Sequence, residues 1–176
     1  PGVLDERVVV VTGGAGLLGR RFCTEIAAHG GVAIVADIDL PGAEVIAAEI
    51  RSQGGRAEAA VIDITDTSSI DQLIDELHRS YGRIDAVVNN AYPRNANYGR
   101  RMEDVTYGDF CENVSLHLGG YFLVSQRFVA HFRTHGGGNI VNLASIYGVV
   151  APQFDLYEGT SMTMPVEYAA IKAGVV

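Results

Sequence analysis

Short apolar runs alternate along this chain with segments in which apolar residues recur at helical spacing. The apolar runs are rich in β-branched residues and each leads into Gly, Asp, Asn or Ser, which is typical of buried parallel strands. They occupy residues 7–14, 31–39, 57–64, 84–90 and 138–145. Between the runs, helices are predicted around Leu18, Phe22 and Ile26, around Val45, Ile46 and Ile50, over Ile70, Leu73, Ile74 and Leu77, from about Thr106 to His131, and around Tyr168.

Regular alternation of strands and helices predicts a doubly wound parallel sheet with a three-layer α/β/α architecture. The 176 residues, 48% of them hydrophobic, suffice for one globular domain with a substantial core. Because no repeat, low-complexity tract or linker interrupts the pattern, we expect residues 1–176 to form a single domain.

A glycine-rich turn, TGGAGLLG at residues 12–19, lies between the first predicted strand and the first predicted helix. Its Gly13, Gly16 and Gly19 follow the pattern G-x-x-G-x-x-G. Glycine permits a tight turn and the close approach of a pyrophosphate, which then meets the amides at the helix N-terminus. Glycine-rich turns also serve simple strand–helix packing, but the strand–turn–helix context favours a dinucleotide site.

Acidic and amide side chains follow the next strands. Asp37 stands about 20 residues beyond the turn, where an adenosine ribose finds its hydrogen-bond acceptor. Its charge would repel a 2′-phosphate, so NAD is favoured over NADP. Asp63 is a candidate acceptor for an adenine amino group, although Asp is also common at helix starts. Asn89, Asn90 and Ala91 end the fourth strand, at the edge of the sheet where ligands bind.

Tyr168 and Lys172 are four residues apart in a predicted helix and therefore share a face. A nearby ammonium favours the phenolate form, which suits tyrosine to general acid–base chemistry on an alcohol or carbonyl. Ser145, at the end of the fifth predicted strand, is placed to donate a hydrogen bond to the substrate oxygen. By spacing alone, a surface helix with a chance tyrosine and lysine would be the better interpretation.

Together these motifs resemble the short-chain dehydrogenase/reductase superfamily, over nearly the whole chain. The resemblance implies a Rossmann fold, NAD as cofactor and hydride transfer, with Ser145 polarising the carbonyl, Tyr168 moving the proton and Lys172 tuning Tyr168 and holding the nicotinamide ribose. The cofactor-binding residues it implies are Gly13, Gly16, Leu18, Gly19, Asp37, Asp63, Asn90, Ala91, Tyr168 and Lys172.

The chain departs from the family pattern in several places. His117 takes the position of the asparagine that normally helps hold a water in the proton relay, while Asn113 lies one helical turn earlier. Histidine can carry a proton, and a buried structural histidine is the alternative. Tyr92 replaces the glycine that usually follows Asn-Asn-Ala, and the segment between Ser145 and Tyr168 is longer than usual.

Two loops, NNAYPRN at residues 89–95 and the long segment at 148–165, resemble a bacterial subgroup tied to flagellin modification and legionaminic-type acid biosynthesis. We expect the second loop to cover the mouth of the active site. Arg94, Arg100 and Arg101 suit an anionic substrate, such as a phosphorylated or nucleotide-linked sugar, but solvent exposure explains them equally well.

Composition and charge limit the classes of binding partner that can be expected. A net charge of −8 argues against nucleic acid or an anionic membrane as the main partner. The two cysteines, Cys23 and Cys111, are far apart and suggest no disulfide, and no membrane-length apolar run appears, so a cytoplasmic protein is expected. His131 and His135 are four apart, but with no third metal ligand apparent, contact with the helix C-terminus is the expected role.

The leading hypothesis is an NAD-dependent oxidoreductase acting on a small polar alcohol or carbonyl. The alternatives are a catalytically silent dinucleotide-binding scaffold or sensor, suggested by His117, and a sugar-nucleotide epimerase or dehydratase, suggested by the glycine spacing. The family resemblance further implies a homodimer or homotetramer, and two more strands and a substrate segment beyond Val176.

Overall fold

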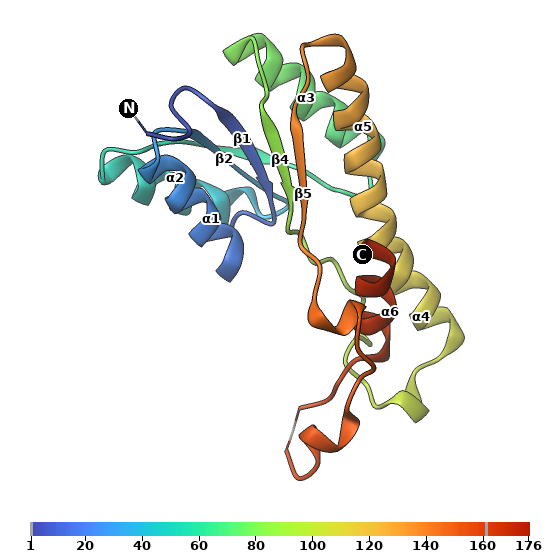
Figure 1. Cartoon of the computed structure of the whole chain (residues 1–176). Helices are drawn as coiled ribbons and strands as arrows, with labels where there is room; N and C mark the ends of the chain where they lie inside the picture. The colour runs from blue at the N-terminus through green and yellow to red at the C-terminus, as the bar shows by residue number, and fades with distance from the viewer. Residues whose placement is uncertain (1, 161) are drawn as a thin grey trace. The chain divides into compact units, whose positions relative to one another are not determined.

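The computed structural model describes residues 2–160 and 162–176 and divides them into two compact units (Figure 1). The first unit contains the chain up to Ala91 together with Tyr121–Asn142. The second contains Tyr92–Gly120 and Leu143–Val176. That the whole chain forms one domain stays a prediction.

The first unit is built on a parallel sheet with the strand order β3-β2-β1-β4-β5. This arrangement confirms the predicted doubly wound fold. The strand order reverses between β1 and β4, so the carboxyl ends of these two strands flank the crevice in which such sheets bind ligands. The strands are β1 (Val8–Thr12), β2 (Val32–Asp37), β3 (Arg56–Val61), β4 (Ala86–Asn89) and β5 (Asn139–Asn142).

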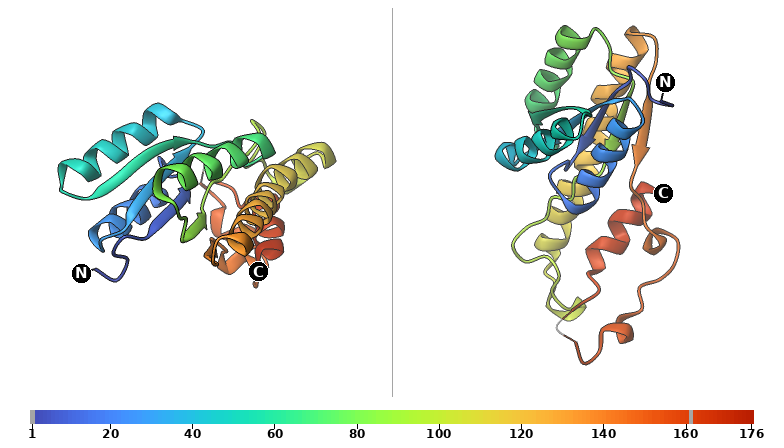
Figure 2. Two further views of the ribbon diagram at one scale, coloured as in Figure 1. Left: turned by 90° about the horizontal axis from the view of Figure 1, so that it is seen from above. Right: turned by 90° about the vertical axis from the view of Figure 1, so that its left-hand side faces the viewer.

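Helices cover both faces of this sheet (Figures 1 and 2). Right-handed crossovers place the helices of the β1-β2-β3 half on one face and those that lead to β4 and β5 on the other. On the first face lie α1 (Leu17–Ala28) and α2 (Leu40–Ser52); on the second lie α3 (Thr67–Tyr81) and α5 (Gly120–Thr134).

The core follows the alternation of the strands. Val9 and Val11 of β1 join a buried cluster with α1 and α2, because successive strand residues point to opposite faces of a sheet. The predicted α3 positions are all buried: Ile70, Leu73, Ile74 and Leu77. Two positions of the helical pattern are not in the core, since Leu18 is 61% exposed and Val45 58% exposed.

The helix starts of the first unit differ in one respect that bears on function. Asp39 and Asp66 begin α2 and α3, and their carboxylates accept from the amides of Gly42 and Ser68. Helix α1 begins at Gly16, which supplies no side-chain acceptor. The first amides of α1 therefore lack the side-chain cap that the other two helices have.

The second unit consists of helices and connecting loops. The helix predicted from Thr106 to His131 is observed as α4 (Tyr107–Val114) and the π-helix η2 (Ser115–Gly119) of this unit, followed by α5, which belongs to the first unit from Tyr121 on. Helix α5 ends three residues later than predicted, at Thr134. The unit also contains the short 3-10 helices η1 (Met102–Asp104), η3 (Ile146–Gly148) and η4 (Phe154–Tyr157), and α6 (Val166–Val175). None of the helices in the described part of the chain combines the length and apolarity needed to cross a membrane.

The fifth strand is shorter than its apolar pattern predicts. β5 ends at Asn142, and Ser145 lies beyond it in extended conformation, as the residue that begins η3. Ser145 is therefore a residue of the turn in the second unit and not of the strand.

Candidate functional site

The glycine-rich turn of the first unit is shaped by close backbone contacts. Gly13 has φ of +67°, a conformation that side chains rarely adopt, and an added Cβ would lie 2.7 Å from the Cα of Ala91. An added Cβ at Gly19 would collide with the carbonyl oxygen of Gly13. Packing within the protein therefore requires glycine at both positions, independently of any ligand.

Gly16 differs from these two glycines. A Cβ there would meet only the Gly13 carbonyl oxygen, at 3.3 Å, and the position is exposed at the uncapped start of α1. Space in front of free amides at a helix N-terminus fits an anionic group such as a pyrophosphate. Leu18, the other predicted contact in this turn, lies on the exposed side of the first turn of α1.

Asp37 stands at the end of β2 and faces the glycine-rich turn. One of its carboxylate oxygens accepts from the amide of Ala15 at 3.0 Å, and the other accepts from the amide of Asp39 at 3.0 Å. Both bonds leave lone pairs on the carboxylate, which has about four acceptor sites in all. Asp63 is used differently, because its Oδ1 accepts from the amide and the hydroxyl of Thr65.

Asn90 ties the end of β4 to the glycine-rich turn. Its side-chain amide donates to the carbonyl oxygens of Thr12 at 2.9 Å and Gly13 at 3.0 Å. The Thr12 hydroxyl oxygen in turn accepts from the amides of Asn90 and Ala91, each at 3.1 Å. The structure therefore brings Gly13, Asn90 and Ala91 together and gives Asn90 a positioning role toward the turn.

The second unit holds the three residues predicted to be catalytic, Ser145, Tyr168 and Lys172, and Lys172 is the most deeply buried of the three. Lys172 lies on α6 and is only 5% exposed. It is the single lysine of the sequence. The ammonium donates to the carbonyl oxygen of Leu143 at 2.5 Å and lies 3.5 Å from Nε2 of His117. Burial lowers the pKa of Lys172 to about 8.

His117 lies within the π-helix η2 and is fully buried. Burial and the nearby Lys172 ammonium lower the pKa of His117 to about 3, so the ring is neutral at physiological pH. An ammonium can only donate, so the neutral ring accepts at Nε2 and carries its proton on Nδ1. A π-helical segment is rare and often occurs at functional sites.

Asn113 has other partners than Lys172. Its side-chain oxygen accepts from the amide of Asn95 at 2.9 Å, and its nitrogen donates to the carbonyl oxygen of Asp109 at 3.0 Å. The same nitrogen lies 3.4 Å from Oε1 of Glu167, a fully buried carboxylate that the sequence pattern did not single out. Of the two candidates for the relay position, His117 is the one beside Lys172.

Tyr168 lies one helical turn before Lys172, as the spacing predicted. The Lys172 ammonium is 5.7 Å from the centroid of the Tyr168 ring, and the ring is partly exposed. Tyr92 packs edge-on against both Tyr168 and His117, with centroid distances of 5.9 and 4.7 Å. Tyr92, which replaces the usual glycine, therefore contacts both Tyr168 and His117. Burial raises the pKa of Tyr92 to about 12.

Ser145 lies close to α6 through the turn that it begins. Its hydroxyl oxygen accepts from the amide of Tyr147 at 3.3 Å, which leaves its proton available for donation. The ring of Tyr147 is 6.4 Å from that of Tyr168. A Cβ added at Gly148, in the same turn, would lie 2.6 Å from the carbonyl oxygen of Lys172. The turn of Ser145 thus rests directly on the helix that carries Tyr168 and Lys172.

The three loop arginines have different surroundings. The Arg94 guanidinium stacks at 5.7 Å from the ring of Tyr92 and 5.8 Å from that of Tyr98. Arg100 donates to Oδ1 of Asn97 at 2.7 Å. Arg101 lines a cavity of about 520 Å³ in the second unit. The long segment at 148–165 contributes apolar and aromatic residues to the same cavity: Phe154, Tyr157, Met162 and Met164. Among the described residues, those predicted to be catalytic do not line this cavity.

The chain is similar to known proteins over nearly its whole length. The family model described as short chain dehydrogenase matches residues 7–176. The chain is 37% identical over 175 residues to the post-translational flagellin modification protein A of Campylobacter coli, covering 98% of this chain and 68% of that protein. It is 32% identical to the 7alpha-hydroxysteroid dehydrogenase of Bacteroides fragilis, covering 98% of this chain and 62% of that protein.

Solved structures have the same fold. An NAD+-bound xylitol dehydrogenase superposes with a TM-score of 0.84 at 25% identity, over 98% of this chain and 62% of its own. A gluconate 5-dehydrogenase from Burkholderia cenocepacia, in complex with NADP and tartrate, gives a TM-score of 0.81 at 26% identity, again over 98% and 62%. The chain therefore spans roughly two thirds of the length of the proteins it resembles.

The lowered pKa of His117 predicts how stability changes with pH. Because the folded state resists protonating this ring, its contribution to stability is complete above about pH 6.5 and is lost as the pH falls toward 3. In the His117→Gln variant this loss is absent, while the side-chain oxygen can still accept from Lys172. Between pH 7 and 5 the variant should lose less stability than the parent, by up to about 2 kcal/mol.

Denaturant unfolding of both proteins at the two pH values measures this difference. Any contribution of the other histidines is common to both proteins and cancels. An identical pH dependence of parent and variant would contradict the neutral, buried assignment of His117.

Proposed function

Because this chain belongs to the short-chain dehydrogenase family, we propose that it forms the cofactor-binding and proton-transfer part of an NAD-dependent oxidoreductase that interconverts a small polar alcohol and its carbonyl compound. The observation that carries the proposal is internal to the second unit. The turn begun by Ser145 lies against the helix on which Tyr168 is followed, one turn later, by a buried Lys172.

Each of the three residues has a role that its surroundings suit. The Ser145 oxygen accepts from a backbone amide, so its hydroxyl proton can be directed to the substrate oxygen. Tyr168 is partly exposed and is placed to exchange a proton with that oxygen. Lys172 is held by the Leu143 carbonyl group, and its ammonium stabilises the phenolate through which Tyr168 passes. A bound nicotinamide supplies the site that accepts or gives the hydride.

His117 is proposed to stand in for the usual asparagine of the proton relay. Nε2 of its neutral ring lies 3.5 Å from the Lys172 ammonium and can accept a hydrogen bond from it, as a relay partner of Lys172 has to. The proposal assigns it a positioning role toward Lys172. Asn113 instead holds Asn95 and the start of the 92–101 loop to α4.

The preference for NAD over NADP rests on Asp37. Its carboxylate lies at the end of β2, beside the glycine-rich turn, where it would accept from ribose hydroxyl groups and repel a 2′-phosphate. Arg20, which directly follows the glycine-rich turn in sequence, pairs with Glu49 at 2.7 Å and so already has an acidic partner in place of a 2′-phosphate. Solved relatives include both an NAD+ complex and an NADP complex, so this preference belongs to the individual chain.

The substrate is proposed to be a small polyol or sugar derivative. Relatives include a xylitol dehydrogenase and a gluconate 5-dehydrogenase, and the chain is similar to a flagellin modification protein. A phosphorylated sugar has weaker support from the arginines than the sequence suggested, because Arg94 stacks on tyrosines and Arg100 bonds to Asn97. Arg101 lines the cavity of the second unit together with Glu103 and Glu158, so it adds little support for an anionic substrate.

We also propose that the protein assembles as a homodimer or homotetramer. Phe122 and Val129 are seven residues apart on α5 and therefore share a face, and both are exposed. Exposed apolar side chains aligned on one helix are typical of a contact between subunits.

Removing the phenolic oxygen of Tyr168 tests the proposed chemistry. In the full-length protein, Tyr168→Phe should lower kcat about 100-fold or more, because the proton donor is lost, while NAD binding stays close to that of the parent. Turnover of an alcohol panel and calorimetric NAD titration measure the two effects. Tyr107→Phe, at an exposed tyrosine of α4, is the matched control and should change neither.

Undiminished turnover in Tyr168→Phe would refute the assignment. A parent protein that binds NAD but oxidises nothing in the panel would instead favour a dinucleotide-binding scaffold or sensor.

The Asp37→Asn variant tests the cofactor preference. The amide oxygen still accepts from Ala15, but the negative charge is gone, so the ratio of kcat/KM for NAD+ to that for NADP+ should fall about tenfold or more. Asp39→Asn removes a neighbouring charge while keeping a good cap for α2, and it should leave the ratio unchanged. A parent that prefers NADP+, or an unchanged ratio in Asp37→Asn, would show that Asp37 does not select the cofactor.

A further inference from the structure

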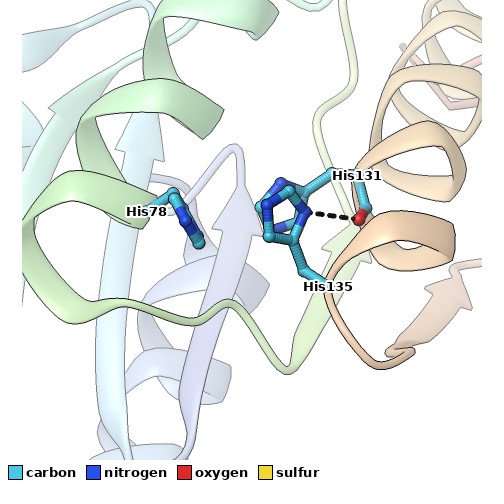
Figure 3. A group of neighbouring side chains, drawn as sticks. All are labelled: His78, His131 and His135. Atoms are coloured by element: carbon cyan, nitrogen blue, oxygen red, sulfur yellow. Dashed lines mark hydrogen bonds between the residues drawn. The ribbon is translucent and has the colours of Figure 1, made fainter.

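Three histidines meet between α3 and α5 in the first unit, away from the glycine-rich turn (Figure 3). His78 comes from the last turn of α3, His131 from the last turn of α5, and His135 from the residue after the end of α5. One ring nitrogen of each lies within 4.8 Å of the corresponding nitrogens of the other two. The third histidine that the sequence pattern lacked is therefore supplied by a different helix.

The packing of α3 against α5 fixes this meeting point. Arg127 of α5 makes a two-pronged ion pair with Asp71 of α3, at 2.6 and 2.7 Å. His131 follows Arg127 by four residues and His78 follows Asp71 by seven, so each histidine shares a helix face with one partner of the ion pair. The histidines consequently lie along the seam between the helices that the ion pair holds in register.

The three histidines differ in exposure: His131 is buried, His78 is half-buried and His135 is exposed. His131 is 8% exposed, and its Nε2 has no hydrogen-bond partner among the residues that the structure describes. The buried Nδ1 of His78 likewise has none within the described chain. Nδ1 of His135 lies 2.9 Å from the carbonyl oxygen of His131 and 2.8 Å from the hydroxyl oxygen of Thr134. When this nitrogen donates to the carbonyl group, the lone pair of the ring is on Nε2.

The surroundings of His131 favour its neutral form. Burial, together with His135 and His78, lowers the pKa of His131, and the carboxylate of Asp75 on α3 opposes this only in part. The rings of His131 and His135 are stacked at 4.2 Å, and that of His78 is tilted toward His135 at 4.3 Å. Three imidazole nitrogens that converge in this way suit a divalent cation of intermediate softness.

We propose that His78, His131 and His135 form a binding site for a divalent transition metal, with Zn2+ as the fitting ion. Three imidazole nitrogens on Zn2+ at about 2.0–2.1 Å, in tetrahedral geometry, would be about 3.4 Å apart. The three nitrogens therefore have to approach one another by small side-chain rotations. The fourth position falls to water, and the ion would clamp the C-terminal ends of α3 and α5 together.

Contact with the helix C-terminus, the role expected from sequence for His131 and His135, is compatible with this site. The bond from His135 Nδ1 to the His131 carbonyl group uses one nitrogen and orients the other, as hydrogen bonds from the non-ligating nitrogen do for metal-binding histidines. His29 makes the same kind of contact with the carbonyl oxygen of Glu25, also at 2.9 Å, but lies outside the cluster. It therefore provides a matched control.

Zn2+ titration of the full-length, chelator-treated protein by calorimetry tests the proposal, with Co2+ absorption as a report on coordination. The parent should bind a single Zn2+ at this site and unfold at a higher temperature when Zn2+ is present. His78→Gln and His135→Gln should each weaken binding about tenfold or more and remove the thermal shift, whereas His29→Gln should behave as the parent. Lowering the pH should weaken binding, because protons compete for the same nitrogens.

Two results would overturn the site: no saturable Zn2+ or Co2+ binding by the parent, or parent-like affinity in both His78→Gln and His135→Gln. Because the readouts are binding and unfolding temperature, the outcome does not depend on whether the protein turns over any alcohol.

Discussion

The second unit is organised around one buried ammonium group, that of Lys172. Burying an isolated charge is costly unless it is paired or hydrogen-bonded, and here the Leu143 carbonyl oxygen and the neutral ring of His117 lie within reach. The lowered pKa of Lys172 means that keeping it charged costs stability at neutral pH. The single lysine of the sequence thus occupies a position that packing alone would not favour, which is typical of a functional residue.

Other features of the unit follow from this placement. Gly148 lets the turn of Ser145 approach the backbone of α6, and a Cβ at Gly174 would lie 2.5 Å from the side chain of Leu118. The π-helix η2 contains His117, whose Nε2 lies 3.5 Å from the Lys172 ammonium. In the first unit the corresponding constraint is the glycine-rich turn, whose backbone is held by Asn90 and Asp37 and whose helix begins without a side-chain cap. One unit carries the residues proposed for proton transfer, and the other carries those proposed for the dinucleotide.

Local patterns determine what could be predicted from the sequence. The parallel sheet follows from β-branched runs, and the glycine-rich turn from residues only three apart, so both were predictable. The end of β5 before Ser145 and the exposure of Leu18 depend on packing that periodicity does not encode. His78 illustrates the limit most clearly, because it joins His131 and His135 only when α3 and α5 pack together.

The departures from the family pattern also became interpretable only in three dimensions. The sequence left His117 and Asn113 as alternatives for the relay position. His117 lies beside Lys172 and Asn113 bonds to Asn95, while the relay role of either residue stays a prediction. Tyr92 appeared as a lost glycine, yet its ring packs against Tyr168 and His117. Glu167 gave no signal beforehand, because a carboxylate in the first turn of a helix is usually solvent-exposed, whereas this one is fully buried.

Transfer of deuterium from substrate to cofactor tests the central claim most directly. The full-length protein would be incubated with NAD+ and polyols deuterated at the carbinol carbon, together with the phosphate esters of the same polyols. The account predicts that deuterium appears on the nicotinamide ring of the NADH formed, with one carbonyl product for each NADH. Bound NAD+ that stays oxidised and undeuterated across the whole panel would contradict it.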